Sequence, residues 1–284
     1  MYSILQIIEL SAEYLNTKGV ESPRLNAELL LANLLNCKRL DLYLKYDQPL
    51  KEIEINKYRE LIARRGKREP LQYIIGNVEF YGLNFSVNPN VLIPRQETEI
   101  LVDQIISNID KNTKVKILDI GTGSGNIPIA LAKNLPNVEI VAIDISGNAI
   151  AIAKFNSERN NVSDRINFIN SDFNKYLISE NHQFDIIVSN PPYIKMDEYN
   201  LLEKELTDFE PNIALTDFND GLTFYRNISE KSKSLLKSNG QIYFEVGISQ
   251  SGKVKEILEN NNFSNIKLVK DYLEIERVVY GDKN

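Results

Sequence analysis

A double proline after an apolar strand is the feature that most limits how this chain folds. The apolar run 184–189 predicts a buried strand, and Asn190-Pro191-Pro192-Tyr193 follows it directly. Two consecutive prolines remove two backbone donors and restrict φ, so the strand cannot continue through them. The chain must therefore make a stiff turn just past a strand's carboxyl end, which is where open α/β sheets bind their ligands.

This turn offers hydrogen-bond acceptors for a planar NH2 group. Such a group carries two N–H donors, and the side-chain oxygen of Asn190 and the carbonyl of Pro191 supply two acceptors. Tyr193 would then cover the flat face of the group. Taken alone, the tetrapeptide is equally well interpreted as a surface turn, so the neighbouring strands decide its meaning.

A second predicted strand leads into a glycine-rich turn. The β-branched run 115–120 precedes Gly121-Thr122-Gly123-Ser124-Gly125, and a helix is expected from Asn126. Glycines permit positive φ and close approach of a ligand, and the helix beyond them begins with free N–H groups. Plain tight turns and dinucleotide enzymes share this pattern. The turn therefore indicates a nucleotide-type site that suits a carboxylate-bearing ligand, without naming it.

Carboxylates follow the next two predicted strands. Asp144 lies 23 positions after Gly121, where an acidic residue accepts hydrogen bonds from ribose hydroxyls; the alternative is that it caps the following helix. Asp172 and Phe173 follow a third strand and suit an adenine ring. Their alternative roles are a helix cap and a core side chain. Four strand ends are thus predicted to converge on one ligand.

In this order, the motifs resemble S-adenosylmethionine-dependent methyltransferases of the Rossmann-like class that modify a planar nitrogen. Enzymes that methylate adenine N6 share Asn-Pro-Pro-Tyr, so the flanking segments decide the substrate. These segments are similar to the PrmC/HemK family, which methylates the glutamine of the Gly-Gly-Gln motif in class 1 peptide-chain release factors. The matching segments include 68–76, 79–82, 92–99, Glu210-Pro211, Asp220-Gly221-Leu222 and Glu245-Val246-Gly247-x-x-Gln250. The family usually has Pro where Gln96 stands and Asp where Asn26 stands.

The resemblance implies an α/β fold: a Rossmann-like class I methyltransferase sheet with a small N-terminal helical domain and a β-hairpin connection. We expect an N-terminal helical substrate-recognition domain over 1–75, a β-hairpin linker over 76–96 and a methyltransferase domain over 97–284. We expect a monomer that acts in the cytoplasm.

The resemblance also implies the roles of the site residues. S-adenosyl-L-methionine is expected to contact Gly121, Thr122, Gly123, Ser124, Gly125, Asp144, Asp172, Phe173 and Asn190. The substrate is expected to contact Asn190, Pro191, Pro192 and Tyr193, of which Asn190, Pro191 and Tyr193 are catalytic.

Three other functions stay open. A close relative methylates a glutamine of a large-subunit ribosomal protein with the same turn. An adenine-N6 nucleic-acid methyltransferase is disfavoured by charge, because 1–96 hold 13 basic and 11 acidic residues and the remainder holds 20 and 28. A non-catalytic cofactor-binding protein is the third. The basic cluster 64–68 is interpreted as a solvated helix end rather than as a contact for an acidic protein or RNA.

Composition limits the remaining classes. At 284 residues and 43% hydrophobic content, the chain is large enough for two domains with substantial cores. The lone Cys37 and the lone His182 predict neither a disulfide nor a metal site, and His182 is expected in an exposed loop. No apolar run approaches the roughly 20 residues that span a bilayer, and no secretory signal is recognised, so no membrane contact is expected.

Periodicity predicts the N-terminal helices and the outer strands. A first helix should bury Leu5, Ile8, Ala12 and Leu15, with a Ser3/Gln6 capping box. A second should be capped by Ser22 and bury Leu25, Leu29 and Ala32. Further helices are expected over 39–46 and 53–65, a hairpin over 77–87, and strands over 241–245, 266–269 and 273–279.

Overall fold

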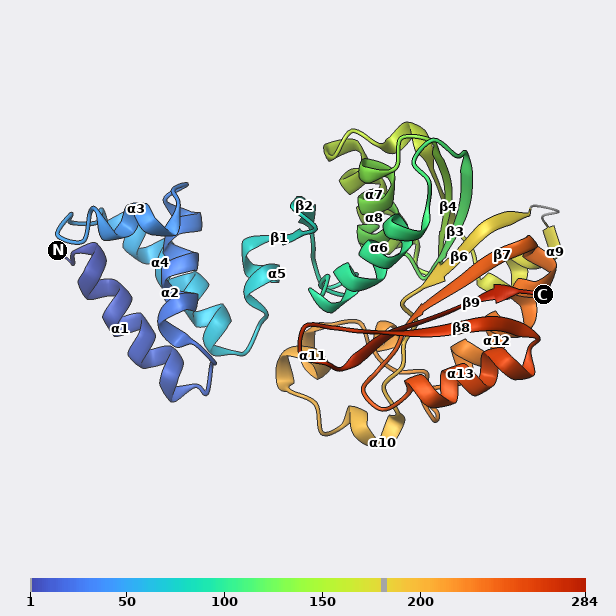
Figure 1. The fold of residues 1–284 in the computed structure, drawn as a ribbon. Helices are drawn as coiled ribbons and strands as arrows, with labels where there is room; N and C mark the ends of the chain where they lie inside the picture. The colour runs from blue at the N-terminus through green and yellow to red at the C-terminus, as the bar shows by residue number, and fades with distance from the viewer. Residues whose placement is uncertain (1, 180–182) are drawn as a thin grey trace. The chain divides into compact units, whose positions relative to one another are not determined.

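The structure, a computed structural model, describes residues 2–179 and 183–284, which divide into two compact units. The helical unit extends to Asn77 and includes Glu203–Phe209; the sheet unit holds Val78–Leu202 and Glu210–Asn284. Figure 1 shows helices in the first and a sheet flanked by helices in the second. The division differs from the expected ranges in two ways: 203–209 pack with the N-terminal helices, and most of the expected linker packs with the sheet unit.

The helical unit has a core formed by its longest helices. Ile8 and Leu15 of α1 and Leu30 and Leu31 of α2 are fully buried, and so is Tyr58 of α4. The capping box of α1 is present as predicted, because Ser3 and Gln6 each bond the other's backbone N–H. The elements are α1 (Ile4–Thr17), α2 (Pro23–Leu34), α3 (Arg39–Tyr43), α4 (Glu52–Gly66), α5 (Leu71–Ile75) and α11 (Lys204–Phe209).

The start and the buried face of α2 differ from the prediction. Ser22 has φ 46° and its side chain makes no cap. The Asn26 side-chain amide donates to the carbonyls of Glu21 and Ser22 and so holds the segment before the helix. Leu25 is 40% exposed. The predicted face was rotated, because the helices around α2 cover the stripe of Ala27, Leu30 and Leu31 instead.

The predicted hairpin is present as β1 (Asn77–Phe80) and β2 (Leu83–Ser86). Tyr81 and Gly82 both have positive φ, as the tightest hairpin turns require. Asn156 of α8 (Gly147–Arg159) accepts from the Ser86 N–H across 2.7 Å and donates to the Ser86 carbonyl across 3.1 Å. The hairpin is therefore fixed to the sheet unit.

In the part of the chain that the structure describes, the sheet has seven strands in the order β5-β4-β3-β6-β7-β9-β8. The first five in this order are parallel, and β9 runs antiparallel to β7 and β8. The order reverses beside β3, which creates the crevice where such sheets bind ligands. The strand predicted from Leu273 begins later, because Leu273 lies in the exposed turn before β9. The strands are β3 (Val115–Ile120), β4 (Val138–Asp144), β5 (Ile166–Asn170), β6 (Phe184–Ser189), β7 (Leu236–Glu245), β8 (Phe263–Lys270) and β9 (Glu276–Lys283).

Helices cover both faces of the sheet (Figure 1). On one face α6 (Glu97–Asn108), α7 (Asn126–Asn134) and α8 pack on side chains such as Ile117 and Ile140. On the other, α9 (Phe173–Ser179), α12 (Thr223–Leu235) and α13 (Ser251–Asn260) pack on Leu118 and Ile187. Alternate residues of each strand thus enter opposite cores. The remaining short elements are α10 (Met196–Tyr199), η1 (Ser163–Arg165) and η2 (Asn212–Ala214).

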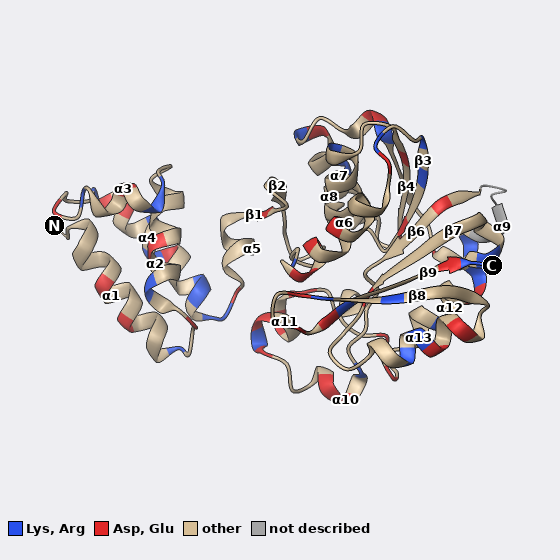
Figure 2. Ribbon diagram, in the orientation of Figure 1, with Lys and Arg blue, Asp and Glu red and all other residues tan. Residues whose placement is uncertain are grey.

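Charged residues of both signs are interspersed along the elements of both units (Figure 2). Within the described ranges, none of the helices combines the length and the apolar character needed to cross a membrane.

Candidate active site

The ends of the parallel strands lie in one row. The strand register pairs Asn170 with Asp144, Ile143 with Ile120, and Ile120 with Ser189. The Ser189 hydroxyl donates to the carbonyl of Ile120 across 2.8 Å, which ties β6 to β3 at this edge. The turns that follow these strands therefore emerge side by side, as the sequence predicts.

The glycine-rich turn is shaped differently at its three glycines. Gly121 and Gly123 have φ 76° and 55°, and a Cβ atom on either would meet nothing within 4 Å. A Cβ on Gly125 would lie 3.0 Å from Ile129 Cδ1 and 3.1 Å from Ala153 Cβ. The first two glycines thus leave open space beside the backbone, whereas the third allows α7 and α8 to pack closely.

Asp144 anchors this turn. Its Oδ2 accepts the Gly123 N–H across 2.8 Å, and its Oδ1 accepts the Ser146 N–H across 2.9 Å. Burial raises the pKa of Asp144, while these two N–H donors act in the opposite direction. The carboxylate both braces the glycine turn and contacts the start of the next helix. Its predicted ribose contact stays a prediction.

Asp119 is a candidate site residue to which the sequence analysis gave no role. It ends β3 just before the glycine turn, is fully buried, and neither carboxylate oxygen has a hydrogen-bond partner. Burial raises its pKa to about 7, and the charge of Asp144 acts in the same direction. An unsatisfied buried carboxylate is unusual and favours a cationic or N–H-donating ligand. The sequence signal was a carboxylate within an otherwise apolar strand.

Asp172 and Phe173 lie at the end of β5 in the roles named as alternatives. Asp172 Oδ1 accepts the Asn174 N–H across 2.7 Å at the start of α9. Phe173 is half-buried and packs on the core beneath α9 and α12. Both residues are at the predicted edge, and their contact with adenine stays a prediction.

The Asn-Pro-Pro-Tyr turn is held at both ends. Asn190 Nδ2 donates to the hydroxyl of Thr98 in the first turn of α6, across 3.2 Å. The Tyr193 carbonyl accepts from Gln250 Nε2 across 2.8 Å, and the Tyr193 hydroxyl donates to Glu245 Oε1 across 3.4 Å. Pro191 is buried and Pro192 half-buried between these supports. The turn is thus fixed at the edge beside the glycine turn, because Ser189 and Ile120 are neighbours.

Thr98, Glu245 and Gln250 were not among the predicted site residues. Each lies in a segment that supports the family resemblance, but spacing alone assigned it no role. Their contacts join α6, β7 and α13 to the Asn-Pro-Pro-Tyr turn. A contact between segments distant in the chain is visible only in the folded structure.

Comparisons with known proteins identify the family of this chain. Residues 6–76 match the PrmC N-terminal domain, and residues 96–207 match the methyltransferase small domain. The chain is 43% identical over 281 residues to the release factor glutamine methyltransferase of Fusobacterium nucleatum. The alignment covers 98% of this chain and 78% of that protein. It is 38% identical over 287 residues to the release factor glutamine methyltransferase of Rhodopirellula baltica. That alignment covers 99% of this chain and 97% of that protein. The chain belongs to the release factor glutamine methyltransferase family.

Solved structures of low identity show the fold of this family member. A methyltransferase from Pyrococcus furiosus superposes with a TM-score of 0.53 at 19% identity, covering 72% of this chain and 91% of that one. The hMettl16 catalytic domain superposes with a TM-score of 0.54 at 16% identity, covering 81% and 82%. The sheet unit is therefore a class I, Rossmann-like methyltransferase fold, as predicted.

Membership of this family and the fold imply S-adenosylmethionine as the methyl donor. The residues present fit such a cofactor. Gly121 and Gly123 leave open space, and the buried Asp119 carboxylate has no partner and suits an ammonium group. The hydroxyls of Thr122 and Ser124 are also buried without partners.

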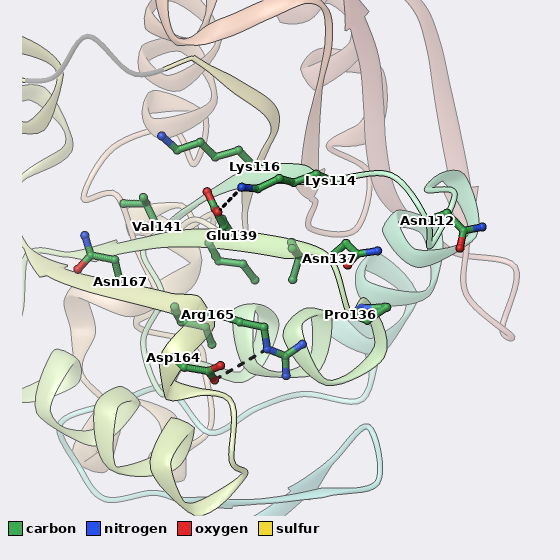
Figure 3. Close-up of a pocket in the computed structure, with 13 residues that line it drawn as sticks. Asn112, Lys114, Lys116, Pro136, Asn137, Glu139, Val141, Asp164, Arg165 and Asn167 are labelled. Carbon is green, nitrogen blue, oxygen red and sulfur yellow. Dashed lines mark ion pairs between the residues drawn. The ribbon is translucent and has the colours of Figure 1, made fainter.

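A cavity of about 770 Å³ lies at the opposite, amino edge of β3, β4 and β5 (Figure 3). Lys114 pairs with Glu139 across 2.7 Å, and Arg165 donates to the carbonyl of Ala132 across 2.5 Å. Lys114 and Glu139 thus pair with each other, and Arg165 binds the backbone. Because class I chemistry occurs at the carboxyl edge of the sheet, we place the active site there despite the size of this cavity.

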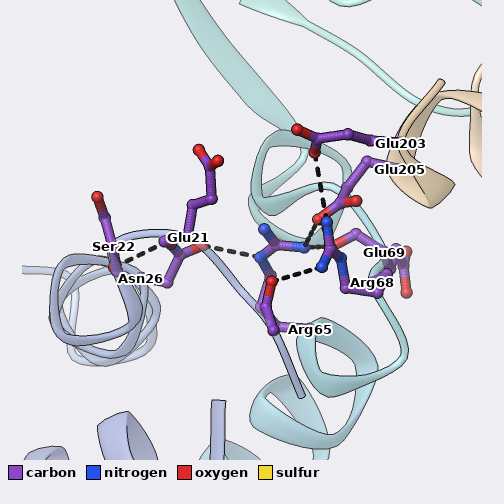
Figure 4. A network of polar contacts seen from close by, with 9 residues as sticks. Glu21, Ser22, Asn26, Arg65, Arg68, Glu69, Glu203 and Glu205 are labelled. Atoms are coloured by element: carbon purple, nitrogen blue, oxygen red, sulfur yellow. Dashed lines mark hydrogen bonds and ion pairs between the residues drawn. The ribbon is translucent and has the colours of Figure 1, made fainter. Parts of the chain in front are cut away.

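The basic cluster 64–68 has a structural role within the helical unit (Figure 4). Arg65 donates to Asn26 Oδ1 across 2.8 Å and to Glu205 Oε1 across 3.1 Å. Arg68 donates to the same Glu205 oxygen across 2.6 Å. The interpretation as a solvated helix end was therefore wrong for these two arginines, since they attach α11 to the N-terminal helices. His182, expected in an exposed loop, lies outside the described residues.

Proposed function

We propose that this protein transfers a methyl group from S-adenosylmethionine to the side-chain amide nitrogen of the glutamine in the Gly-Gly-Gln motif of class 1 peptide-chain release factors. One observation carries the proposal: Asn190 is anchored through its NH2 end to Thr98, at the sheet edge beside the glycine turn. Its side-chain oxygen is left to accept an N–H of a substrate amide. The names of the full-length relatives supply the substrate class.

The proposed chemistry rests on positioning. An amide nitrogen is a poor nucleophile because its lone pair is delocalised into the carbonyl, and no side chain at this edge is basic enough to remove its proton beforehand. The side-chain oxygen of Asn190 and the carbonyl of Pro191 would accept its two N–H groups and orient the nitrogen. Orientation of this kind is worth up to about 7 to 11 kcal/mol in the best cases. One amide proton then passes to solvent.

The cofactor would be held by the turns after β3, β4 and β5. Bound S-adenosylmethionine supplies an electrophilic methyl group on a sulfonium. The backbone N–H groups of the glycine turn and the carboxylates of Asp119 and Asp144 would hold its polar groups, and Asp172 and Phe173 would border its base. Tyr193 would cover the face of the substrate amide, and the buried surroundings of the turn would exclude water.

The helical unit would recognise the release factor, and the enzyme would act as a monomer in the cytoplasm, where translation ends. A glutamine of a large-subunit ribosomal protein is the second candidate substrate. Adenine in nucleic acid is the third, and the acidic balance of residues 97–284 opposes it.

Mass spectrometry of substrate proteins tests the proposal. Purified release factor, ribosomal protein and adenine-containing RNA would each be incubated with the enzyme and S-adenosylmethionine. The expected result is one methyl group on the glutamine of the Gly-Gly-Gln motif, and none when that glutamine is replaced by asparagine. Methylation of only the ribosomal protein or only the RNA would assign the corresponding alternative. No transfer to any substrate would refute the proposal.

A further inference from the structure

A fully buried side chain of α8 joins the hairpin to the glycine-rich turn. Asn156 is 0% exposed and forms hydrogen bonds through both ends of its amide. Its Oδ1 accepts the Ser86 N–H across 2.7 Å, and its Nδ2 donates to the carbonyls of Ser86 and Ser124 across 3.1 and 2.9 Å. Ser86 ends β2 of the hairpin, and Ser124 lies between the second and third glycines of the turn. The sequence analysis gave Asn156 no role.

The two bonds to Ser86 set the direction of the Asn156 amide. The backbone of Ser86 offers one donor and one acceptor, so the oxygen of Asn156 must face the N–H and the NH2 end must face the carbonyl. Rotation of the amide by half a turn would place donor against donor and acceptor against acceptor. With this direction fixed, the second N–H of Asn156 points to the Ser124 carbonyl. The hairpin thus determines where the donor to the turn points.

The bond to Ser124 fixes one peptide plane of the turn. In a trans peptide the C=O and the following N–H point in opposite directions. The Ser124 carbonyl faces Asn156, and the Gly125 N–H bonds on the other side to the carbonyl of Thr122 across 2.9 Å. Ala153 lies three residues before Asn156 on the same face of α8, and its Cβ is 3.1 Å from where a Cβ on Gly125 would lie. This half of the turn therefore rests on α8.

Asn156 and Asp144 hold neighbouring residues of the turn. Asp144 accepts the Gly123 N–H across 2.8 Å, and Asn156 bonds the next residue, Ser124. The open space beside Gly121 and Gly123 depends on the shape that these contacts maintain. We infer that Asn156 is a positioning residue for S-adenosylmethionine, which transfers the support of the hairpin to the turn that receives the cofactor. This inference rests on the proposed placement of the cofactor at the glycine-rich turn.

The hairpin and the cofactor should therefore stabilise each other. If the Ser86 contact helps the turn to bind the cofactor, the bound cofactor must make that contact harder to break by the same factor, because coupling between two sites is reciprocal. A hairpin that served only as a connection would not respond to the cofactor. The coupling can thus be measured from either side.

Titration calorimetry with S-adenosylhomocysteine measures it from the cofactor side. Asn156→Asp keeps an oxygen for the Ser86 N–H but loses both donors, and we expect its Kd to rise about 10-fold. Asn160→Ala is the matched control. Asn160, the C-cap residue of α8, donates to the Asn84 carbonyl of the hairpin across 3.1 Å, and its other bond goes to the backbone of α8.

The control separates positioning from general support of the fold. Asn160→Ala should lower the denaturation midpoint, because it loses a bond to the hairpin, yet keep Kd within about twofold of the wild type. An unchanged Kd in folded Asn156→Asp, or an equal rise in both variants, would overturn the inference.

Hydrogen exchange measures the coupling from the hairpin side in the wild type, so it decides the question even if Asn156→Asp does not fold. At saturating S-adenosylhomocysteine the Ser86 N–H should exchange about 10-fold more slowly, beyond any protection of the Lys116 N–H. The Lys116 N–H bonds to Asp185 Oδ2 across 2.8 Å at the amino edge of the sheet and reports uniform stabilisation. Equal protection of the two amides would overturn the inference.

Failure of the inference is distinct from failure of the proposed function. A wild type that binds no S-adenosylhomocysteine would refute the cofactor site and this inference together. A wild type that binds it but methylates no release factor would refute only the proposed substrate. The Kd of Asn156→Asp and the exchange of the Ser86 N–H would still decide the role of Asn156.

Discussion

The side-chain amide of Gln250 donates a hydrogen bond to the backbone carbonyl of Tyr193 across 2.8 Å. The same side chain accepts the Gly247 N–H across 3.1 Å through its oxygen. The start of α13 therefore fixes the exit of the Asn-Pro-Pro-Tyr turn, although the two residues are far apart in the chain. A rigid exit matters because misplacement by a fraction of an ångström weakens any reaction that depends on orientation.

Gly221 lies against this contact and should not tolerate a side chain. Its φ is +77°, and a Cβ would overlap the Tyr193 carbonyl oxygen and lie 2.9 Å from Gln250 Nε2. We expect Gly221→Ala to lower the free energy of unfolding by about 2 to 3 kcal/mol and to reduce kcat. Gly252→Ala is the matched control, because a Cβ there meets nothing within 4 Å. It should keep kcat and gain up to about 1 kcal/mol. Equal behaviour of the two variants in denaturation and turnover would refute the close approach.

Asp144→Ala should weaken cofactor binding before it affects chemistry. The variant loses the acceptor of the Gly123 N–H and the proposed ribose contact. We expect the Kd for S-adenosylhomocysteine to rise about 10- to 100-fold, the usual effect of losing charged hydrogen bonds. Titration calorimetry measures this, with the exposed Asp164→Ala as a control that should bind as the wild type does. An unaltered affinity in Asp144→Ala would remove Asp144 from the cofactor site.

Asp119 should make the cofactor-free protein less stable as pH rises. Burial raises its pKa from 3.8 to about 7, so the folded state binds the proton more tightly than the unfolded state does. The contribution of Asp119 to the free energy of unfolding is most favourable below about pH 4. This contribution, at most about 4 kcal/mol, is lost as pH rises to about 7. Asp119→Asn should therefore reduce the decline in stability between pH 5 and pH 8. Urea denaturation at both pH values tests this, and identical declines in the two proteins would contradict it.

Glu205 should stabilise the helical unit through Arg65 and Arg68. Arg65 is 7% exposed, and both arginines share Glu205 Oε1. Glu205→Gln leaves the buried Arg65 without its charge partner, while Arg68 keeps only the exposed Glu203, and should cost about 3 kcal/mol of unfolding free energy. Glu203→Gln is the matched control, because Glu203 is 59% exposed and pairs with Arg68 across 3.3 Å. That variant should change stability by less than about 1 kcal/mol. Equal denaturation midpoints for the two variants would mean that the network in Figure 4 does not hold α11 in place.

The sequence predicts the parts of this protein that local rules control. Strand, turn and helix order followed from apolar runs, glycines and prolines, and the Ser3/Gln6 capping box was confirmed because both partners lie within one turn. The exposed Leu25 was wrongly assigned to the core, because which stripe of α2 is buried depends on its neighbouring helices. Glu245 and Thr98 received no role for the same reason. Their coupling to Asn190 and Tyr193 arises only when β7, α6 and the turn meet in the fold.

Asn190 should act on the reacting amide in addition to its predicted contact with the cofactor. The most direct measurement is kcat for release factor methylation by Asn190→Ala, with its Kd for S-adenosylhomocysteine determined on the same preparation. We expect kcat to fall on the order of 10³-fold, as for the loss of a preorganised transition-state contact, while Kd changes less than about tenfold. A kcat close to that of the wild type, or a loss confined to cofactor affinity, would contradict it.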